Sequence, residues 1–312
     1  MAEIIARDAK FADPTTTADG KPRASVAPTG LTTLWVNTGT LCNLTCENCY
    51  IESSPTNDRL AYISRAEVRA YLDEIAGSDL ETEEIGFTGG EPFMNPDIMG
   101  MLEDSLGAGH RVLVLTNAMR PMMKHARGLL ALGSRYGDAL TLRVSVDHFE
   151  PDRHRQERGP RSWRPMMEGL RWLSESGFAV HIAGRTRWGE DEHTLRAGFA
   201  ALFAAEEIAV DAHDPASLVL FPEMDTSADV PEITTECWDL LGRRPEDQMC
   251  ASSRMVVKRR GAETPEVVAC TLLPYDERFA MGPTLASSLR PVALNHPHCA
   301  KFCVLGGGSC SA

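Results

Sequence analysis

The chain has 312 residues, of which 43% are hydrophobic, and it carries a formal net charge of −13. This length accommodates one large α/β domain with a small appendage. The acidic balance argues against nucleic acid and anionic membranes as partners, and no apolar run reaches the roughly 18 residues of a membrane span. The N-terminus lacks the pattern of a secretory signal, so we expect a cytoplasmic protein.

Residues 1–30 are polar and rich in Thr, Ala and Pro, and we expect a flexible N-terminal lead-in. From residue 31 onward, apolar β-branched runs alternate with longer amphipathic stretches. The predicted strands are Thr33–Asn37, Glu84–Thr88, Arg111–Thr116, Leu140–Val146, Phe178–Gly184 and Ser217–Phe221. The predicted helices are Ser64–Ala76, Asn95–Gly107, Pro121–Tyr136, Trp163–Ser176 and Glu192–Glu206.

Two signals support this division into elements. Ser64 and Glu67 have the spacing of a capping box, which predicts that the first helix begins there. Strands that alternate with helices are typical of a parallel sheet with right-handed crossovers. We therefore predict a partial (β/α)6 TIM-like barrel over residues 31–225, with an open doubly wound sheet as the alternative.

The pattern changes after Pro222. A short helix at Ile233–Leu241 is followed by a candidate hairpin, Arg254–Arg260 and Glu266–Cys270. The rest is rich in Pro, Gly and Cys and has little apolar surface to bury, so it needs a metal to hold its shape. Residues 226–312 are therefore predicted to form a small cysteine-rich domain.

The nine cysteines are the outlying feature of the composition. Clustered cysteines in a chain without a secretory signal bind metal more often than they form disulfides. Cys42, Cys46 and Cys49 follow the first predicted strand, at the edge of a parallel barrel where active sites gather. Three thiolates can hold three irons of a 4Fe–4S cluster and leave the fourth iron open, which favours catalysis. A zinc site or an electron-transfer cluster would require a fourth ligand, and this loop has neither a histidine nor a fourth cysteine. A chance grouping of free thiols is the third alternative.

The CxxxCxxC spacing with an aromatic residue after it, Tyr50, resembles the radical S-adenosylmethionine superfamily. The resemblance covers roughly residues 31–225. It implies that the amine and carboxylate of S-adenosylmethionine bind the open iron, and that reductive cleavage yields a 5′-deoxyadenosyl radical. It also implies an external one-electron donor such as flavodoxin or ferredoxin.

The segment Gly89-Gly90-Glu91 at the end of the second strand resembles the methionine-binding motif of this family. The glycines let the backbone approach a ligand closely, and the Glu91 carboxylate is predicted to bind a ligand amine. The alternative is a tight turn with a surface glutamate.

The later strands also end in polar residues. Asn117 is predicted to contact a ribose hydroxyl, Ser145 to approach the cofactor, and Arg185 to pair with the cofactor's carboxylate. An ordinary turn for Asn117 and a surface salt bridge for Arg185 are the alternatives. A run of arginines follows the fourth strand and reads as a solvated loop and helix face: Arg153, Arg155, Arg158, Arg161 and Arg164.

The C-terminal cysteines resemble the twitch form of an auxiliary-cluster domain, a relative of the longer SPASM form. The predicted ligands of one auxiliary 4Fe–4S cluster are Cys250, Cys270, Cys299 and Cys303. Cys310 could replace Cys303, and the role of Cys237 stays open. A zinc site that uses His296 or His298, and a three-cysteine cluster that binds substrate, are the alternatives.

Together these features predict a radical S-adenosylmethionine enzyme of the oxidoreductase or maturase type. It would abstract a hydrogen atom from a small-molecule or peptide substrate, with oxidation or bond formation as the outcome. The candidates for accepting the accompanying proton are Asp147, His148 and Glu223. The alternative from another class is a non-catalytic zinc or iron–sulfur scaffold, or an electron-transfer protein.

Overall fold

The computed structural model of the chain describes residues 10–223 and 229–308. Within these ranges six parallel strands pair in chain order. They are β2 (Thr33–Asn37), β3 (Glu84–Thr88), β4 (Arg111–Thr116), β5 (Leu140–Asp147), β6 (Ala179–Arg185) and β7 (Leu218–Phe221). The predicted α/β class and partial TIM-like barrel are confirmed.

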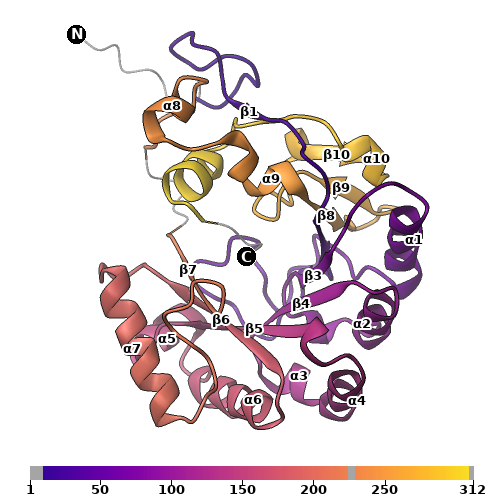
Figure 1. Cartoon of the computed structure of the whole chain (residues 1–312), viewed down its shortest axis with the longest axis vertical. Helices are drawn as coiled ribbons and strands as arrows, with labels where there is room; N and C mark the ends of the chain where they lie inside the picture. Colours follow the sequence, from indigo (N-terminus) through magenta and orange to yellow (C-terminus); the bar gives the residue numbers. More distant parts are fainter. Residues whose placement is uncertain (1–9, 224–228, 309–312) are drawn as a thin grey trace.

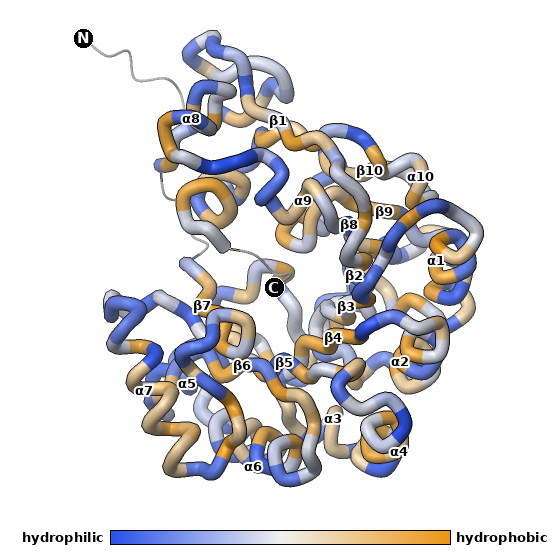
Figure 2. The backbone as a smooth tube through the Cα atoms, viewed as in Figure 1, coloured by the Kyte–Doolittle hydropathy of each residue, from blue (hydrophilic) through white to orange (hydrophobic). Residues whose placement is uncertain are grey.

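Helices cover the outer face of these strands (Figure 1). They are α1 (Arg65–Ala76), α2 (Ile98–Gly107), α4 (Ala126–Tyr136), α6 (Trp163–Glu175) and α7 (Glu192–Ala205). Figure 2 shows hydrophobic and hydrophilic positions alternating along these helices, because one side of each packs on the sheet. The capping box of α1 is confirmed: the Ser64 hydroxyl accepts from the Glu67 N–H, and the Glu67 carboxylate accepts from the Ser64 N–H.

In the barrel part, two of the predicted helices differ from their predicted bounds by more than one residue. The segment predicted as one helix from Pro121 to Tyr136 forms α3 (Arg120–Met123) and then α4, with a turn between them. Helix α2 begins at Ile98 and not at Asn95, because the Asn95 side chain donates to the backbone carbonyls of Thr38 and Ile63. An asparagine committed to such bonds favours a turn over a helix interior. A short 3₁₀ turn, η2 (Pro92–Met94), precedes it.

Part of the arginine run forms a helix that the sequence did not predict, α5 (Pro151–Arg158). Proline at its first position and Gly159 after its end are common helix boundaries. This helix packs beside β5 and carries two of the residues that shape the functional site.

The predicted hairpin is present and extends the barrel sheet. Strands β8 (Ser253–Val257) and β9 (Glu266–Val268) are antiparallel, and β10 (Ala280–Gly282) pairs with β9. Strand β8 also pairs with β2 in parallel, so a nine-stranded sheet runs through the described residues. The boundary near residue 225 stays a prediction, but the sheet is continuous across the two parts.

The remaining C-terminal elements are short. They are α8 (Cys237–Leu241), η4 (Pro245–Asp247), α9 (Met249–Ser252), η5 (Glu277–Phe279), α10 (Leu285–Ser288), β11 (Val292–Ala293) and a π-helical stretch, η6 (Cys299–Leu305). In the barrel part, η3 (Gly137–Ala139) precedes β5. Helix α8 is shorter than the predicted Ile233–Leu241, since Thr234–Glu236 forms a bridge and a turn before it.

The prediction of a flexible lead-in is wrong for residues 10–30. Strand β1 (Ser25–Val26) pairs with β11, and Phe11 and Ala24 are buried in the C-terminal core. The Arg23 guanidinium is buried and paired with Glu232. The few apolar residues are spaced among polar ones, so the average composition concealed their burial. None of the helices in the described ranges combines the length and apolarity that a bilayer crossing requires.

Candidate functional site

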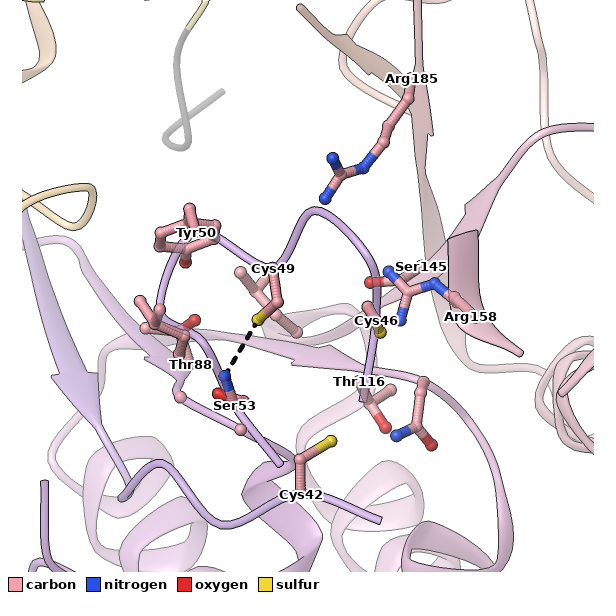
Figure 3. Close-up of a pocket in the computed structure, with 15 residues that line it drawn as sticks. Cys42, Cys46, Cys49, Tyr50, Ser53, Thr88, Thr116, Ser145, Arg158 and Arg185 are labelled. Atoms are coloured by element: carbon pink, nitrogen blue, oxygen red, sulfur yellow. Dashed lines mark hydrogen bonds between the residues drawn. The ribbon is translucent and has the colours of Figure 1, made fainter. Parts of the chain in front are cut away.

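A pocket lies at the carboxyl ends of the parallel strands, and most of the predicted site residues line it (Figure 3). The predicted residues in its lining are Cys42, Cys46, Cys49, Tyr50, Gly89, Gly90, Asn117, Ser145 and Arg185. The lining also contains residues that the sequence analysis did not select: Ile51, Ser53, Thr88, Leu115, Thr116 and Arg158. The strand ends therefore converge as the barrel prediction requires.

The three cysteine side chains surround one space in this pocket (Figure 3). The Leu44 N–H donates to Cys42 Sγ at 3.4 Å, and the Ser53 N–H donates to Cys49 Sγ at 3.3 Å. Burial raises the pKa of Cys42 to about 12 and raises that of Cys46, although the Arg158 guanidinium opposes the second shift. Buried thiols of this kind become thiolates when a metal replaces their protons. The donor set and the N–H···S bonds fit an iron–sulfur cluster.

Gly89 and Gly90 bring the end of β3 against the cysteine loop. A Cβ on Gly90 would lie 2.2 Å from the carbonyl oxygen of Leu41, and one on Gly89 would lie 2.5 Å from that of Gly39. Gly89 also has φ +136°, which a side chain rarely permits. The glycines therefore allow a close approach of the backbone at Gly39 and Leu41, which lead into the cysteine loop.

Glu91 lies behind the pocket and outside its lining. Its carboxylate accepts hydrogen bonds from the Thr116 hydroxyl at 2.9 Å, the Asn117 N–H at 2.8 Å and the Phe93 N–H at 3.2 Å. Burial raises the pKa of Glu91 to about 7, although these hydrogen bonds oppose the shift. This geometry favours a role in tying the end of β3 to the end of β4 over the predicted contact with a ligand amine.

The raised pKa of Glu91 predicts a pH effect on stability. The folded protein keeps this proton up to about pH 7, whereas the unfolded chain releases it near pH 4.5. The stabilisation is therefore complete below pH 4.5 and is lost as the pH rises to 7, by roughly 1.4 kcal/mol per pH unit. In Glu91→Gln this contribution should disappear, as denaturant unfolding at several pH values would show. A constant difference in unfolding free energy between the two proteins would contradict the assignment.

Asp147 is held by two arginines at the end of β5. The Arg158 guanidinium donates to both of its carboxylate oxygens, at 2.5 and 3.2 Å, and Arg185 Nε lies 3.5 Å from Oδ1. Burial alone would raise the pKa of Asp147, but Arg158 and Arg185 hold it below its usual value. A carboxylate stabilised in this way is a weak proton acceptor, which counts against the predicted catalytic role.

The other two predicted proton acceptors also lie outside the lining of this pocket. His148 is fully buried, stacks on Phe149 and accepts from the Glu150 N–H through Nδ1 at 2.9 Å. Burial and the neighbouring Arg153 lower the pKa of His148 to about 4. Glu223 lies 4.0 Å from Arg187. None of the three alternative candidates, Asp147, His148 and Glu223, thus belongs to the lining of the pocket.

The end of α5 clamps the cysteine loop between Cys46 and Cys49. The Glu157 carboxylate accepts from the N–H of Asn48 at 3.0 Å and from its side-chain amide at 3.1 Å. The backbone carbonyl of Glu157 also accepts from the Glu47 N–H at 2.9 Å. Arg187 joins the clamp with a 2.6 Å bond to the Glu157 carboxylate. The buried Glu157 thus fixes the segment that separates two of the thiols.

We expect Glu157→Gln to loosen this loop, because an amide cannot accept from every donor that the carboxylate accepts. The free energy of unfolding should fall by about 1–3 kcal/mol, and the protein should retain less iron after anaerobic gel filtration. Asp152→Asn is the matched control, since Asp152 is exposed on the same helix and, among the residues that the structure describes, forms an ion pair with the nearby Arg155 alone. Equal stability and iron retention in the two variants would refute the clamp.

The C-terminal cysteines gather around the C-terminal core, the hydrophobic cluster in which Phe11 and Ala24 are buried. Cys250 and Cys299 are buried in it, and Cys237, Cys270 and Cys303 pack against it. Burial raises the pKa of Cys250 to about 11 and that of Cys299 to about 12. These surroundings fit ligands of a buried iron–sulfur cluster. The alternative ligand, Cys310, lies outside the described residues.

The described part of the chain contains no three His, Cys, Asp or Glu side chains close enough together to hold a single metal ion. The zinc site predicted as an alternative would use His296 or His298, whose rings lie 4.7 Å apart. Burial lowers the pKa of both histidines. The zinc site, like the auxiliary cluster, therefore stays a prediction.

Arg158 lines the pocket, although it was predicted to be exposed to solvent. It belongs to the arginine run that was predicted to be solvated, yet its side chain is only 13% exposed. Only its position in the sequence separates Arg158 from the other arginines of the run. It stands directly before Gly159, which ends the helix, and in the segment that follows Ser145 and Asp147. Thr88 and Thr116 end strands β3 and β4, so the barrel prediction alone could have placed them.

Comparison with known proteins gives a family match. The sequence pattern of the Radical SAM superfamily matches residues 36–195. The antilisterial bacteriocin subtilosin biosynthesis protein AlbA of Bacillus subtilis is 31% identical over 143 residues, which are 46% of this chain and 30% of AlbA. The chain thus aligns with about a third of the length of such curated relatives.

Two solved structures share the fold at low sequence identity. SuiB of Streptococcus suis bound to S-adenosylmethionine has a TM-score of 0.58 at 12% identity, covering 81% of this chain and 63% of SuiB. The protein anSMEcpe with bound AdoMet has a TM-score of 0.58 at 12% identity, covering 82% of this chain and 79% of that one. Both comparisons extend beyond the residues that the family pattern matches.

Proposed function

Since the chain belongs to the radical SAM superfamily, we propose that it cleaves S-adenosylmethionine reductively and abstracts a hydrogen atom from a substrate. Its cofactors are a 4Fe–4S cluster and S-adenosylmethionine, as in the rest of the superfamily. When bound, they supply the one-electron cleavage that yields the 5′-deoxyadenosyl radical. The observation that carries the proposal is the convergence of three thiols and the polar strand ends on one pocket.

The chain's own residues would hold and orient these groups. Cys42, Cys46 and Cys49 are the proposed ligands of the catalytic cluster. Of the two arginines in the pocket lining, Arg185 is a better candidate than Arg158 for binding the cofactor's carboxylate. Its contacts with Asp147 and Glu157 are long, at 3.5 and 3.7 Å. Further contacts to S-adenosylmethionine are proposed for Tyr50, Gly89, Gly90, Asn117 and Ser145.

A second cluster is proposed for the C-terminal part. Its ligands would be Cys250, Cys270, Cys299 and Cys303, and its chemistry would be to accept the electron left on the substrate. Residues 31–225 would then form the radical SAM part and residues 226–312 the auxiliary part. The buried thiols around the C-terminal core support this division.

The proposed substrate is a small molecule or a peptide, and the relatives favour a peptide. AlbA takes part in bacteriocin biosynthesis, and SuiB has been solved bound to its precursor peptide SuiA. The SuiB–SuiA structure has a TM-score of 0.56 at 12% identity and covers 89% of this chain and 66% of SuiB. An oxidation or a new bond within the peptide would follow from hydrogen abstraction, with an external one-electron donor driving the reaction.

Anaerobic purification with iron and sulfide analysis tests this function. Two 4Fe–4S sites predict about eight irons per chain. Incubation with S-adenosylmethionine and dithionite should release 5′-deoxyadenosine. A protein that binds iron but forms no 5′-deoxyadenosine would instead be an electron carrier or a scaffold.

A further inference from the structure

A second hollow lies next to the cysteine loop, separate from the pocket. This groove has a volume of about 560 Å³ and is lined by Asn43, Phe93, Met94, Asn95, Pro96, Arg120, Pro121, Lys124 and His125. Asn43 follows Cys42 directly, and its side-chain oxygen accepts from the Asn117 amide at 2.9 Å. Because Asn117 lines the pocket, this one hydrogen-bonded pair lies between the groove and the pocket.

The rim of the groove is cationic, although the chain as a whole is acidic. From Ser105 to Gly137 the sequence contains no Asp or Glu. Two cations of this stretch have partners, since Arg111 lies 3.1 Å from Glu83 and Arg135 lies 3.6 Å from Glu103. Three others are exposed and form no ion pair within the described residues: Arg120, Lys124 and Arg127.

The rest of the lining is apolar or already hydrogen-bonded. Phe93 and Pro121 are buried, and His125 Nε2 lies 3.3 Å from the Phe93 carbonyl oxygen. The carboxylate next to the groove, that of Asp97, accepts from the Arg65 N–H at 3.0 Å. An apolar floor inside a charged rim is typical of a protein–protein contact surface.

We propose that this groove docks an acidic one-electron carrier protein that reduces the cluster held by Cys42. The proposal rests on the proposed function. In this step the carrier loses one electron and the oxidised cluster gains it, and no proton or chemical group moves. The cationic rim attracts an acidic partner to the residue adjoining a cluster ligand.

The partition between groove and pocket favours a carrier over a substrate. Hydrogen abstraction requires the reacting atoms to come within roughly 3–3.5 Å of each other, so a substrate must enter the pocket itself. An electron can cross the Asn43–Asn117 pair, whereas a substrate bound in the groove would remain on the wrong side of it. The groove therefore suits a partner that delivers only an electron.

Charge reversal tests the proposal in the anaerobically reconstituted protein. In Arg120→Glu/Lys124→Glu, the dissociation constant for a reduced flavodoxin should rise at least about tenfold at low salt, and the flavodoxin-driven rate should fall similarly. Cleavage driven by dithionite should be unchanged, because a small reductant needs no docking surface. Arg161→Glu is the matched control, since Arg161 is exposed, lies outside the groove and forms no ion pair in the described ranges.

The outcomes separate the two proposals. If dithionite yields no 5′-deoxyadenosine with the unmodified chain, the proposed function fails, whereas flavodoxin binding still reports on the groove. If the double variant binds flavodoxin as tightly as Arg161→Glu does, the docking proposal is overturned. It is also overturned if the reversal weakens binding of a poly-glutamate peptide but leaves flavodoxin binding intact, because the groove would then serve an acidic peptide.

Discussion

Replacing Cys42, Cys46 and Cys49 together by Ala should abolish the release of 5′-deoxyadenosine and remove about half of the bound iron. The three thiols line one pocket, and the rest of its lining contains no other Cys, His, Asp or Glu. Without them no iron is held where S-adenosylmethionine would bind. Iron analysis and chromatographic detection of 5′-deoxyadenosine, both under anaerobic conditions, would measure the two effects.

The matched control is Cys250→Ala/Cys270→Ala, which alters the second group of thiols. This variant should also lose about half of the iron, but it should keep some cleavage of S-adenosylmethionine, because the pocket is unchanged. If cleavage survives in the triple variant, the catalytic cluster lies elsewhere. If both variants retain full iron, the proposed ligands of both clusters are wrong.

Arg158→Met should lower the free energy of unfolding by about 3 kcal/mol. The substitution keeps most of the side-chain volume but leaves the buried Asp147 carboxylate without its two hydrogen bonds from Arg158. The figure is at the low end for a broken buried pair, since Arg185 remains 3.5 Å away. Denaturant unfolding of the metal-free proteins would measure the difference without interference from cluster loss.

The double variant Asp147→Asn/Arg158→Met isolates the cause. Removing both charges should recover part of the lost stability, because no unpaired carboxylate then remains in the interior. If the double variant is as unstable as the sum of the two single variants, the loss reflects packing and not charge.

Local sequence patterns predicted the barrel well because each of its signals is short-range. Six apolar runs became six parallel strands with nearly the expected bounds, and the capping box at Ser64 formed as predicted. The cysteine loop and the strand-end residues followed from the barrel, since parallel strands bring their carboxyl ends to one edge. Tyr50, Ser145 and Arg185 could thus be placed in the pocket from their positions alone.

Local patterns could not predict the surroundings of residues whose partners lie far along the chain. Arg158 looks like its neighbours in the arginine run, and only the fold shows that it faces Asp147. Glu91 lies beside a glycine pair typical of ligand binding, but hydrogen bonds from the end of β4 hold its carboxylate. Residues 10–30 appeared featureless because their partner, β11, is more than 260 residues away.

The pairing of β8 with β2 bears on how the chain can be divided. Strand β2 lies between β3 and β8, so truncation near residue 225 would strip one side of it and expose a row of unsatisfied backbone groups. Open edges of this kind recruit other chains, and a shortened protein would tend to aggregate. The two groups of thiols also sit on one hydrogen-bonded scaffold, without a hinge between β2 and β8. Swapping the C-terminal portion between relatives would therefore require a matched β2.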